Sequence, residues 1–138
     1  MRRTAILAAV AALALSSAAC MGGASLQSPP EPSSYAAALA DPLRPADDRA
    51  RDEARHTAET LAFARVRPGQ KIADMIIGGG YFTRVFSAAV GPQGRVTAWQ
   101  PAEFIAFQAS YGESLTAVDA LANVDGIRSP IAAPDFPS

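Results

Sequence analysis

The stretch KIADMIIGGGYFTRVFSAAVGPQGRVTAW, residues 71–99, decides the fold of this chain. Residues 71–77 form a short, mostly apolar run between turn residues, which predicts a buried strand. Three glycines follow at 78–80, and the apolar spacing of residues 81–90 predicts a helix. Residues 95–99 then predict a second strand. A strand, a glycine loop, a helix and a strand in this order predict a right-handed βαβ unit with parallel strands.

The loop Gly78-Gly79-Gly80 is the candidate ligand site of this unit. Because glycine has no Cβ, a ligand can approach the backbone closely there. The helix that follows directs unpaired N–H groups and the positive end of its dipole toward the same place. Asp74 stands four residues before the first glycine, inside the predicted strand, where its carboxylate needs a hydrogen-bond partner. The alternative is a tight turn that binds nothing.

Two cofactor patterns compete for this loop. Gly78 and Gly80 fit the first two positions of the dinucleotide pattern G-x-G-x-x-G, but its third glycine falls on Thr83. The loop also resembles the S-adenosylmethionine loop of class I methyltransferases, an acid followed by x-G-x-G-x-G. Asp74, Gly78 and Gly80 fit that pattern, and Ile76 stands where its first glycine is expected.

A longer stretch resembles a group of exported bacterial proteins described as predicted methyltransferases. The matching features are the charged segment DPLRPADDRARDEAR (41–55), the ending LAFARVRPG (61–69), the core DMIIGGGYFTRVFS (74–87) and the turn GPQGRV (91–96). Together they cover Tyr35 to about Pro101, and the remainder resembles the group more loosely. The resemblance implies a Rossmann-like α/β sheet with S-adenosyl-L-methionine as cofactor, and an unidentified methyl acceptor.

The same resemblance implies the site residues. Asp74 would orient the loop and the ligand, and Gly78, Gly79 and Gly80, with Tyr81 directly after them, would pass under the amino-acid part of the cofactor. Most class I methyltransferases have an acid at the end of the second strand that accepts both ribose hydroxyls. Gln100 stands there in this chain, and an amide lacks the charge-assisted strength of a carboxylate. Glu103 is near enough in sequence to substitute.

The sequence after Pro101 predicts a helix that Gly112 interrupts, with an aromatic group assigned to the core (Phe104, Phe107, Tyr111). The turn Asn123-Val124-Asp125-Gly126 then leads to a third strand at 127–131, which Pro130 confines to a sheet edge. The related fold orders its strands 3-2-1-4-5-7-6. We therefore expect a fold truncated to about strands 1–3 within residues 35–138, without the substrate-binding half.

Upstream of the βαβ unit, residues 46–64 contain neither Gly nor Pro and predict one helix. One side has an apolar stripe, and the other has oppositely charged residues four apart, such as Asp47 and Arg51. His56 falls on the charged side, where a solvent-exposed histidine is more plausible than a catalytic one. A short helical turn is expected before it, at 35–39.

The first 19 residues have the order of a signal peptide: a basic start, an apolar run and small residues. Cys20 follows Ala18-Ala19, which resembles the lipobox of bacterial lipoproteins; ordinary cleavage that leaves a free thiol, or an uncleaved anchor helix, are the alternatives. Met21 favours sorting to the outer membrane. Residues 20–34, rich in Gly, Ser and Pro, predict a disordered tether. The protein is thus expected to be periplasmic and attached to the membrane through Cys20.

Composition excludes several function classes. Lys and Arg number 12 and Asp and Glu 13, so the charge gives no case for nucleic-acid binding. One cysteine and one histidine cannot build a zinc cluster, and no nucleophile–base pair is visible.

The sequence as a whole leaves three hypotheses for the function. The first is the N-terminal part of an exported methyltransferase, inactive alone. The second is a non-catalytic periplasmic binding lipoprotein with a degenerate half-Rossmann domain, and the third is an oxidoreductase fragment, which Thr83 disfavours.

Overall fold

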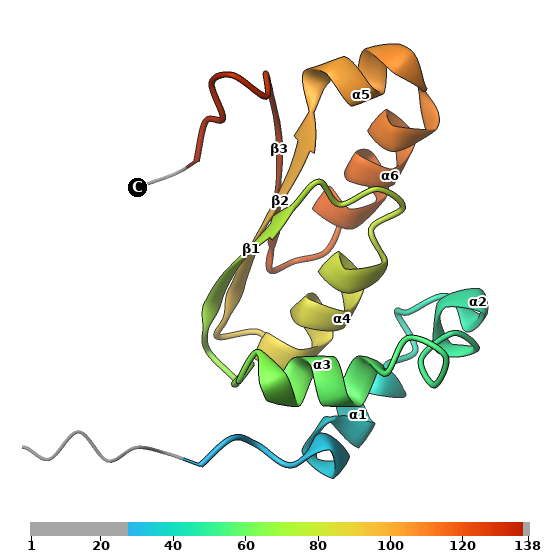
Figure 1. The fold of residues 1–138 in the computed structure, drawn as a ribbon, viewed down its shortest axis with the longest axis vertical. Helices are drawn as coiled ribbons and strands as arrows, with labels where there is room; N and C mark the ends of the chain where they lie inside the picture. The colour runs from blue at the N-terminus through green and yellow to red at the C-terminus, as the bar shows by residue number, and fades with distance from the viewer. Residues whose placement is uncertain (1–27, 137–138) are drawn as a thin grey trace, which may run out of the picture.

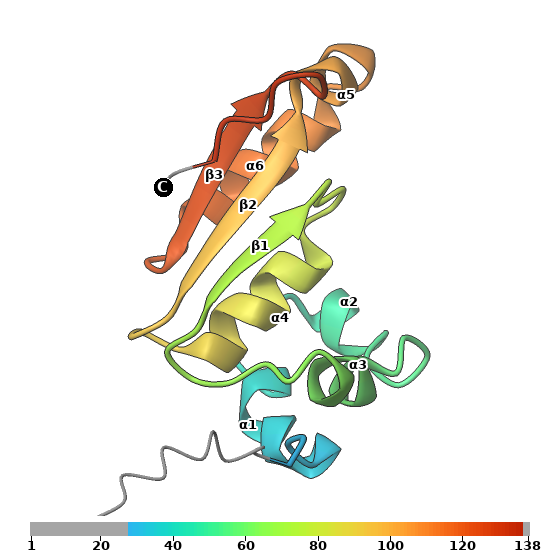
Figure 2. The ribbon, with the colours of Figure 1, turned by 60° about the vertical axis from the view of Figure 1, so that its left-hand side comes forward.

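A three-stranded parallel sheet lies at the centre of residues 28–136, the part of the chain that the computed structural model describes. Strand β1 (Lys71–Met75) pairs with β2 (Arg95–Pro101), and β2 pairs with β3 (Val124–Ser129), so the spatial order is β1-β2-β3. The register places Ala73 beside Thr97 and Trp99 beside Ile127. All three strands point the same way (Figure 2).

The helices lie mainly on one face of this sheet (Figure 1). In chain order the helical segments are the 3₁₀ helix η1 (Pro32–Tyr35), α1 (Ala36–Leu39), α2 (Ala46–Arg49), α3 (Thr57–Phe63), α4 (Tyr81–Val90), α5 (Ala102–Phe107) and α6 (Ser110–Asp119). Helices α4 and α6 cover the sheet directly, whereas α1 packs on α4 and α3 packs on η1. Along the described residues no helix is both long enough and apolar enough to cross a bilayer.

The predicted βαβ unit is confirmed. Helix α4 runs from Tyr81 to Val90 as expected, and Gly91, with φ of +66°, ends it. The sheet-facing side of α4 buries Val85 and Val90 against Val96 and Ala98 of β2, all of them 9% exposed or less. Burial of this apolar surface is the main force that holds helix and sheet together. The architecture is therefore α/β, compatible with a partial Rossmann-like fold.

The single helix predicted at 46–64 is wrong. The segment forms α2 and α3, joined by turns, and His56 has a left-handed φ of +48° that interrupts the helix. Asp48 in this segment is 2% exposed and pairs with Arg84 of α4 at 2.6 Å. Because a contact with another helix neutralises the charge of Asp48, ion pairs between residues four apart are not what determines the backbone conformation of this segment.

The C-terminal expectations need three smaller corrections. Strand β3 starts at Val124, inside the predicted turn, and ends before Pro130. The helix after Pro101 breaks at Gln108, whose φ of −145° is extended, and Gly112 lies inside α6. Phe107, assigned to the core, is 86% exposed.

The described chain begins inside the predicted tether. Pro32–Tyr35 forms η1, and the Tyr35 hydroxyl donates hydrogen bonds to the carbonyls of Leu61 and Val66 at 3.1 and 2.7 Å. These contacts fix the segment to the rest of the molecule, so the ordered part starts before the expected boundary at Tyr35. The predicted signal peptide, Cys20 and most of the tether lie outside the described residues.

The second face of the sheet is largely open. Lys71, Ala73 and Met75 of β1 point to this side and are exposed. The C-terminal segment covers only β2 and β3: Phe136 packs on Trp99 with ring centroids 5.9 Å apart, and Trp99 Nε1 donates to Ser129 Oγ at 2.8 Å. Parallel sheets are normally covered on both faces, so this face is the least protected part of the described fold.

Candidate functional site

The glycine loop lies at the carboxyl end of β1, the end of a parallel sheet at which α/β proteins bind ligands (Figure 1). Three loop residues have left-handed backbones: Ile76 (φ +62°), Gly78 (φ +56°) and Gly80 (φ +74°). Gly78 and Gly80 adopt this conformation without steric cost. Ile76 is β-branched, and a positive φ at such a residue is strained. Strand β1 therefore stops at Met75, earlier than the predicted end at Ile77.

Ile76 holds this conformation because the loop fixes it from several sides. Its amide donates to the carbonyl of Trp99 at 2.9 Å, and the next amide, of Ile77, donates to the same carbonyl at 3.3 Å. The side chain of Ile76 is 47% exposed, so core packing is not what holds it. The backbone at the position of the expected first glycine thus bends as a glycine would.

Asp74 links the end of β1 to helix α4. Its carboxylate accepts a hydrogen bond from Thr83 Oγ1 at 2.6 Å, and Thr83 is completely buried. Burial raises the pKa of Asp74, and the hydrogen bond from Thr83 opposes that rise. Thr83 was noticed in the sequence only as a missing third glycine. In the structure it is the partner that the carboxylate in the strand requires.

Gln100 links the end of β2 to the loop. Its Oε1 accepts a hydrogen bond from the Gly78 amide at 3.0 Å, so the two predicted site residues are in contact. Its Nε2 is buried and has no hydrogen-bond partner. The amide is therefore enclosed in this conformation, and its contact is with the loop backbone. Glu103, the expected substitute, accepts from the Ile131 amide at 3.1 and 3.2 Å and holds the segment after β3 instead.

The middle of the loop offers room for a ligand. A Cβ added to Gly78 or Gly79 would have no atom within 4 Å. At Gly80 a Cβ would come within 2.5 Å of Val118 in α6, so this glycine is required by packing. The open space therefore lies over Gly78 and Gly79. The first amides of α4 border it, since the first turn of a helix has no internal acceptors for them.

Tyr81 is placed differently from the expectation. It is 6% exposed, and its hydroxyl lies 2.5 Å from both Asp52 Oδ1 and Thr57 Oγ1. Its hydroxyl thus contacts the segment before α3 and the first residue of α3, away from the glycines. Burial and the carboxylate of Asp52 raise the pKa of Tyr81. The sequence analysis also missed Arg84, whose guanidinium contacts the Gly79 carbonyl at 3.0 Å.

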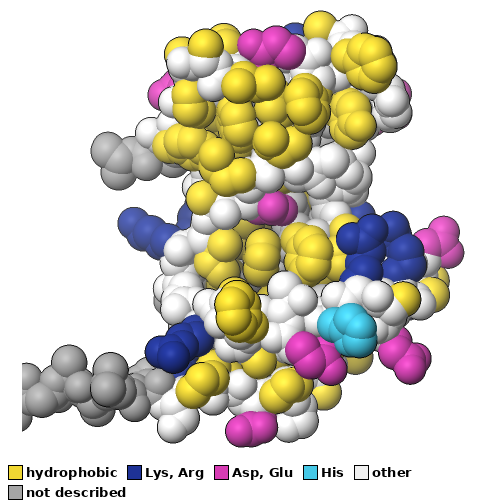
Figure 3. Space-filling view, viewed as in Figure 1, with side chains coloured by type: hydrophobic (Ala, Val, Ile, Leu, Met, Phe, Trp, Pro, Cys, Tyr) yellow, Lys and Arg dark blue, Asp and Glu magenta, His cyan; other side chains and the backbone are white. Residues whose placement is uncertain are grey.

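Hydrophobic side chains surround the carboxyl end of the sheet. Met75, the last residue of β1, and Ile76, directly after it, are about half exposed, and Phe107 of α5 is 86% exposed. Figure 3 shows hydrophobic side chains gathered on this part of the molecule. An apolar surface beside an open glycine loop suits a ligand with an aromatic or aliphatic part.

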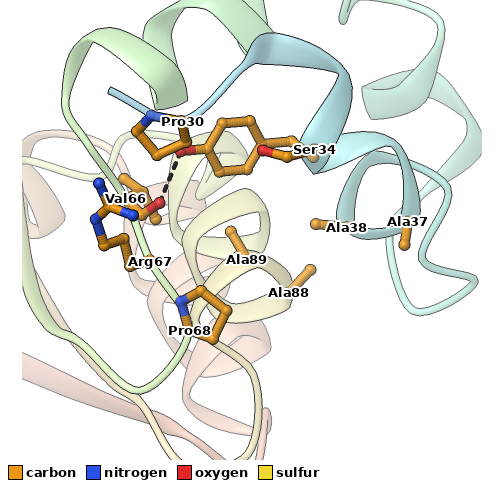
Figure 4. A pocket seen from close by; sticks show the side chains of 10 residues that line it. Pro30, Ser34, Ala37, Ala38, Val66, Arg67, Pro68, Ala88 and Ala89 are labelled. Carbon is orange, nitrogen blue, oxygen red and sulfur yellow. Dashed lines mark hydrogen bonds between the residues drawn. The ribbon is translucent and has the colours of Figure 1, made fainter. Parts of the chain in front are cut away.

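Two cavities lie away from this site. One, of about 410 Å³, lies between η1 and the end of α4 and includes Arg67, Pro68 and Ala89 in its lining (Figure 4). The other, of about 610 Å³, lies over the open face and includes Lys71 and Arg95 in its lining. Both involve residues at the amino ends of the strands, opposite the glycine loop. Within residues 28–136 no group of three or more His, Cys, Asp and Glu side chains could hold a metal ion.

No family model matches the chain, and neither does any curated protein or any solved structure.

Proposed function

We propose that this protein is a methyltransferase-like domain that binds S-adenosyl-L-methionine at the Gly78-Gly79-Gly80 loop. The observation that supports this most is the left-handed backbone of Ile76, at the position where the methyltransferase loop has its first glycine. Backbone strain at such a position is typical of functional loops. Left-handed backbones thus occur at 76, 78 and 80, the three glycine positions of the sequence pattern acid-x-G-x-G-x-G that begins at Asp74, and this spacing supports the proposal.

The loop fits the cofactor in two further respects. The space over Gly78 and Gly79 is open to a ligand, and the first-turn amides of α4 can donate hydrogen bonds to a carboxylate. When bound, S-adenosyl-L-methionine supplies a methyl group on a sulfonium for transfer to a nucleophile. In this chain Asp74 and Thr83 hold β1 against α4, and Gln100 holds Gly78. None of these side chains is assigned a proton-transfer step.

Dinucleotide binding is disfavoured at the third position of its pattern. A glycine there allows close packing of helix and strand. Thr83 is instead buried, and its hydroxyl donates a hydrogen bond to the carboxylate of Asp74. Replacing that pair by a dinucleotide loop would leave the carboxylate of Asp74 without its partner.

The second candidate is a non-catalytic periplasmic binding lipoprotein. The observation that favours it is Gln100, because the end of β2 lacks a carboxylate and the amide is already bound to Gly78. Export and attachment through Cys20 belong to both candidates and rest on the N-terminal sequence alone. Labelling of cells with a fatty acid analogue, lost in Cys20→Ala, tests that part separately.

Calorimetric titration with S-adenosyl-L-methionine and with NAD⁺ tests the proposed function. We expect saturable heat with the first and none with the second. Gly79→Val places its Cβ where no atom lies within 4 Å and extends a side chain into the space proposed for the ligand, so it should weaken affinity at least about tenfold, or 1.4 kcal/mol, in a protein that still folds. Ala120→Val, on an exposed residue after α6, is the matched control. Absence of heat with S-adenosyl-L-methionine rejects the proposal and leaves the binding lipoprotein.

A further inference from the structure

Residues 41–57, called the strap here, connect α1 to the start of α3 and contain a buried group of charges. Arg44 and Asp48 are each 2% exposed. Arg44 pairs with Asp52 at 2.6 Å, and Asp48 pairs with Arg51 at 2.5 Å. Buried charges are costly to desolvate, so the strap depends on having these partners in place.

Arg84 of α4 connects the strap to the glycine loop. Its Nε donates to Asp48 Oδ2 at 2.6 Å, and its Nη2 donates to the carbonyl of Gly79 at 3.0 Å. A tie between the strap and α4 would require only the first of these contacts. The second places the same guanidinium on the middle residue of the loop, in a forked arrangement that arginine can make and lysine cannot.

The peptide unit between Gly79 and Gly80 is thereby held at both ends. Its carbonyl accepts from Arg84, and its N–H, that of Gly80, donates to the Ile77 carbonyl at 2.8 Å. Glycine peptides flip easily because both signs of φ are accessible. Two opposed hydrogen bonds therefore set the direction of the backbone beside the open space.

Tyr81, the first residue of α4, makes a second set of contacts between the strap and this helix. Its hydroxyl contacts Asp52 and Thr57, and three strap guanidiniums, of Arg44, Arg51 and Arg55, lie 5.7, 5.2 and 4.6 Å from its ring centroid. Figure 3 shows basic side chains grouped on the side of the molecule where α2 lies. The strap thus holds the first and fourth residues of α4.

We propose that Asp48 and Arg84 are positioning residues of the cofactor site: Asp48 fixes the Arg84 guanidinium, which fixes the Gly79 carbonyl and so preorganises the loop. The inference rests on the proposed function for its ligand, but the loop geometry can be measured without one. A loop held in its binding conformation binds more tightly, since less ordering is needed on association. Ligand binding at the glycines should therefore depend on a strap that does not touch the ligand.

The test compares Arg84→Gln with Arg95→Gln. The guanidinium of Arg95 pairs with Asp125 at the amino ends of β2 and β3, away from the strap and the loop, and is half exposed, so it is a matched control for loss of an ion pair. In Arg84→Gln we expect hydrogen exchange at the Gly80 amide to accelerate at least about tenfold, and affinity for S-adenosyl-L-methionine to fall by a similar factor. Arg95→Gln should change each by less than about twofold.

Asp48→Asn, alone and combined with Arg84→Gln, shows whether the two residues act in series. If they do, Asp48→Asn accelerates Gly80 exchange in the wild-type background and adds little once Arg84 is replaced. Unchanged Gly80 exchange in folded Arg84→Gln overturns the inference, even if the wild type binds the cofactor. Accelerated exchange with no cofactor binding by the wild type supports the positioning role and rejects the proposed function instead.

Discussion

Ile76 shows at the scale of one residue how a neighbouring strand can set the backbone of the loop. A β-branched side chain disfavours the left-handed backbone by about 1–2 kcal/mol, yet Ile76 adopts φ of +62° with its side chain half exposed. The sequence showed only an isoleucine in place of an expected glycine. It could not show that the backbone keeps the bend, because the bend is held by hydrogen bonds that the amides of Ile76 and Ile77 donate to the Trp99 carbonyl of the neighbouring strand.

Ile76→Gly should therefore stabilise the fold. Relief of the strained φ outweighs the greater freedom of glycine in the unfolded chain, and we expect the free energy of unfolding to rise by up to about 1 kcal/mol. Met75→Gly is the matched control, since Met75 is equally exposed and lies in the strand. That variant should lose about 1 kcal/mol in urea unfolding. A loss at both positions would show that Ile76 is not strained.

Asp74→Asn should separate stability from binding. Burial raises the pKa of Asp74 in the folded protein, so its charged form opposes folding at neutral pH and this penalty disappears as pH falls below the ordinary value near 4. An asparagine can still accept the hydrogen bond from Thr83. We expect the variant to be at least as stable as the wild type at pH 7, with any gain vanishing near pH 3, while cofactor affinity falls about tenfold. A clear loss of stability at pH 7 would contradict this account.

At the scale of elements, the sequence predicted β1, α4 and β2 well and the strap poorly. In the βαβ unit, local periodicity and tertiary burial agree, so the bounds of α4 were found from the apolar spacing alone. In the strap, the same acidic and basic residues can pair four apart in a helix or across elements. In the structure Asp48 pairs with Arg84 of another helix, thirty-six residues away in the chain. A single sequence does not distinguish pairing within one helix from pairing between elements.

The strap should make stability sensitive to acid. The hydrogen bond from Arg44 lowers the pKa of Asp52, although burial of this carboxyl opposes the shift. Burial by itself would raise the pKa of Asp48, but the hydrogen bonds from Arg84 and Arg51 outweigh burial, so the pKa of Asp48 is lowered as well. Groups with a lowered folded pKa stabilise the fold above about pH 4 and lose that contribution as pH falls through the lower value.

Asp52→Asn should accordingly unfold more easily than the wild type at pH 7, by about 1–3 kcal/mol, with the difference shrinking toward pH 3. Urea titrations at several pH values can follow the fluorescence of Trp99, which is 3% exposed. Asp47→Asn, on an exposed side chain of α2, should change stability by less than about 0.5 kcal/mol at any of them. A pH-independent difference for Asp52→Asn would rule out the ion-pair explanation.

At the scale of the whole molecule, the described fold has one covered and one open sheet face (Figure 2). The sequence predicted parallel strands with the third strand at a sheet edge. It did not reveal that the C-terminal segment covers β2 and β3 while β1 stays exposed. That coverage depends on contacts of Phe136, Ser129 and Asp135, which have no local pattern. Nor could the sequence reveal that Gln100 is enclosed by its contact with the loop.

Lysine substitutions on the two faces of the sheet measure the difference in solvent exposure between them. Ala73 of β1 lies on the open face and is exposed, whereas Ala98 of β2 is fully buried against the helices. Ala73→Lys should change the free energy of unfolding by less than about 0.5 kcal/mol, and Ala98→Lys should prevent folding because a charge would be buried without a partner. Equal destabilisation by both, seen by circular dichroism and urea unfolding, would mean that the open face is covered in solution.

Binding of S-adenosyl-L-methionine at the glycine loop can be followed residue by residue in the amide resonances of the loop. In ¹H–¹⁵N spectra of the protein titrated with S-adenosyl-L-methionine, the amides of Gly78, Gly79 and Tyr81 should shift saturably, and NAD⁺ should leave them unchanged. Gly69 and Gly94, at the amino ends of the strands, provide the internal control. Loop amides that stay fixed up to about 1 mM S-adenosyl-L-methionine, or shifts confined to that opposite end, would contradict the claim.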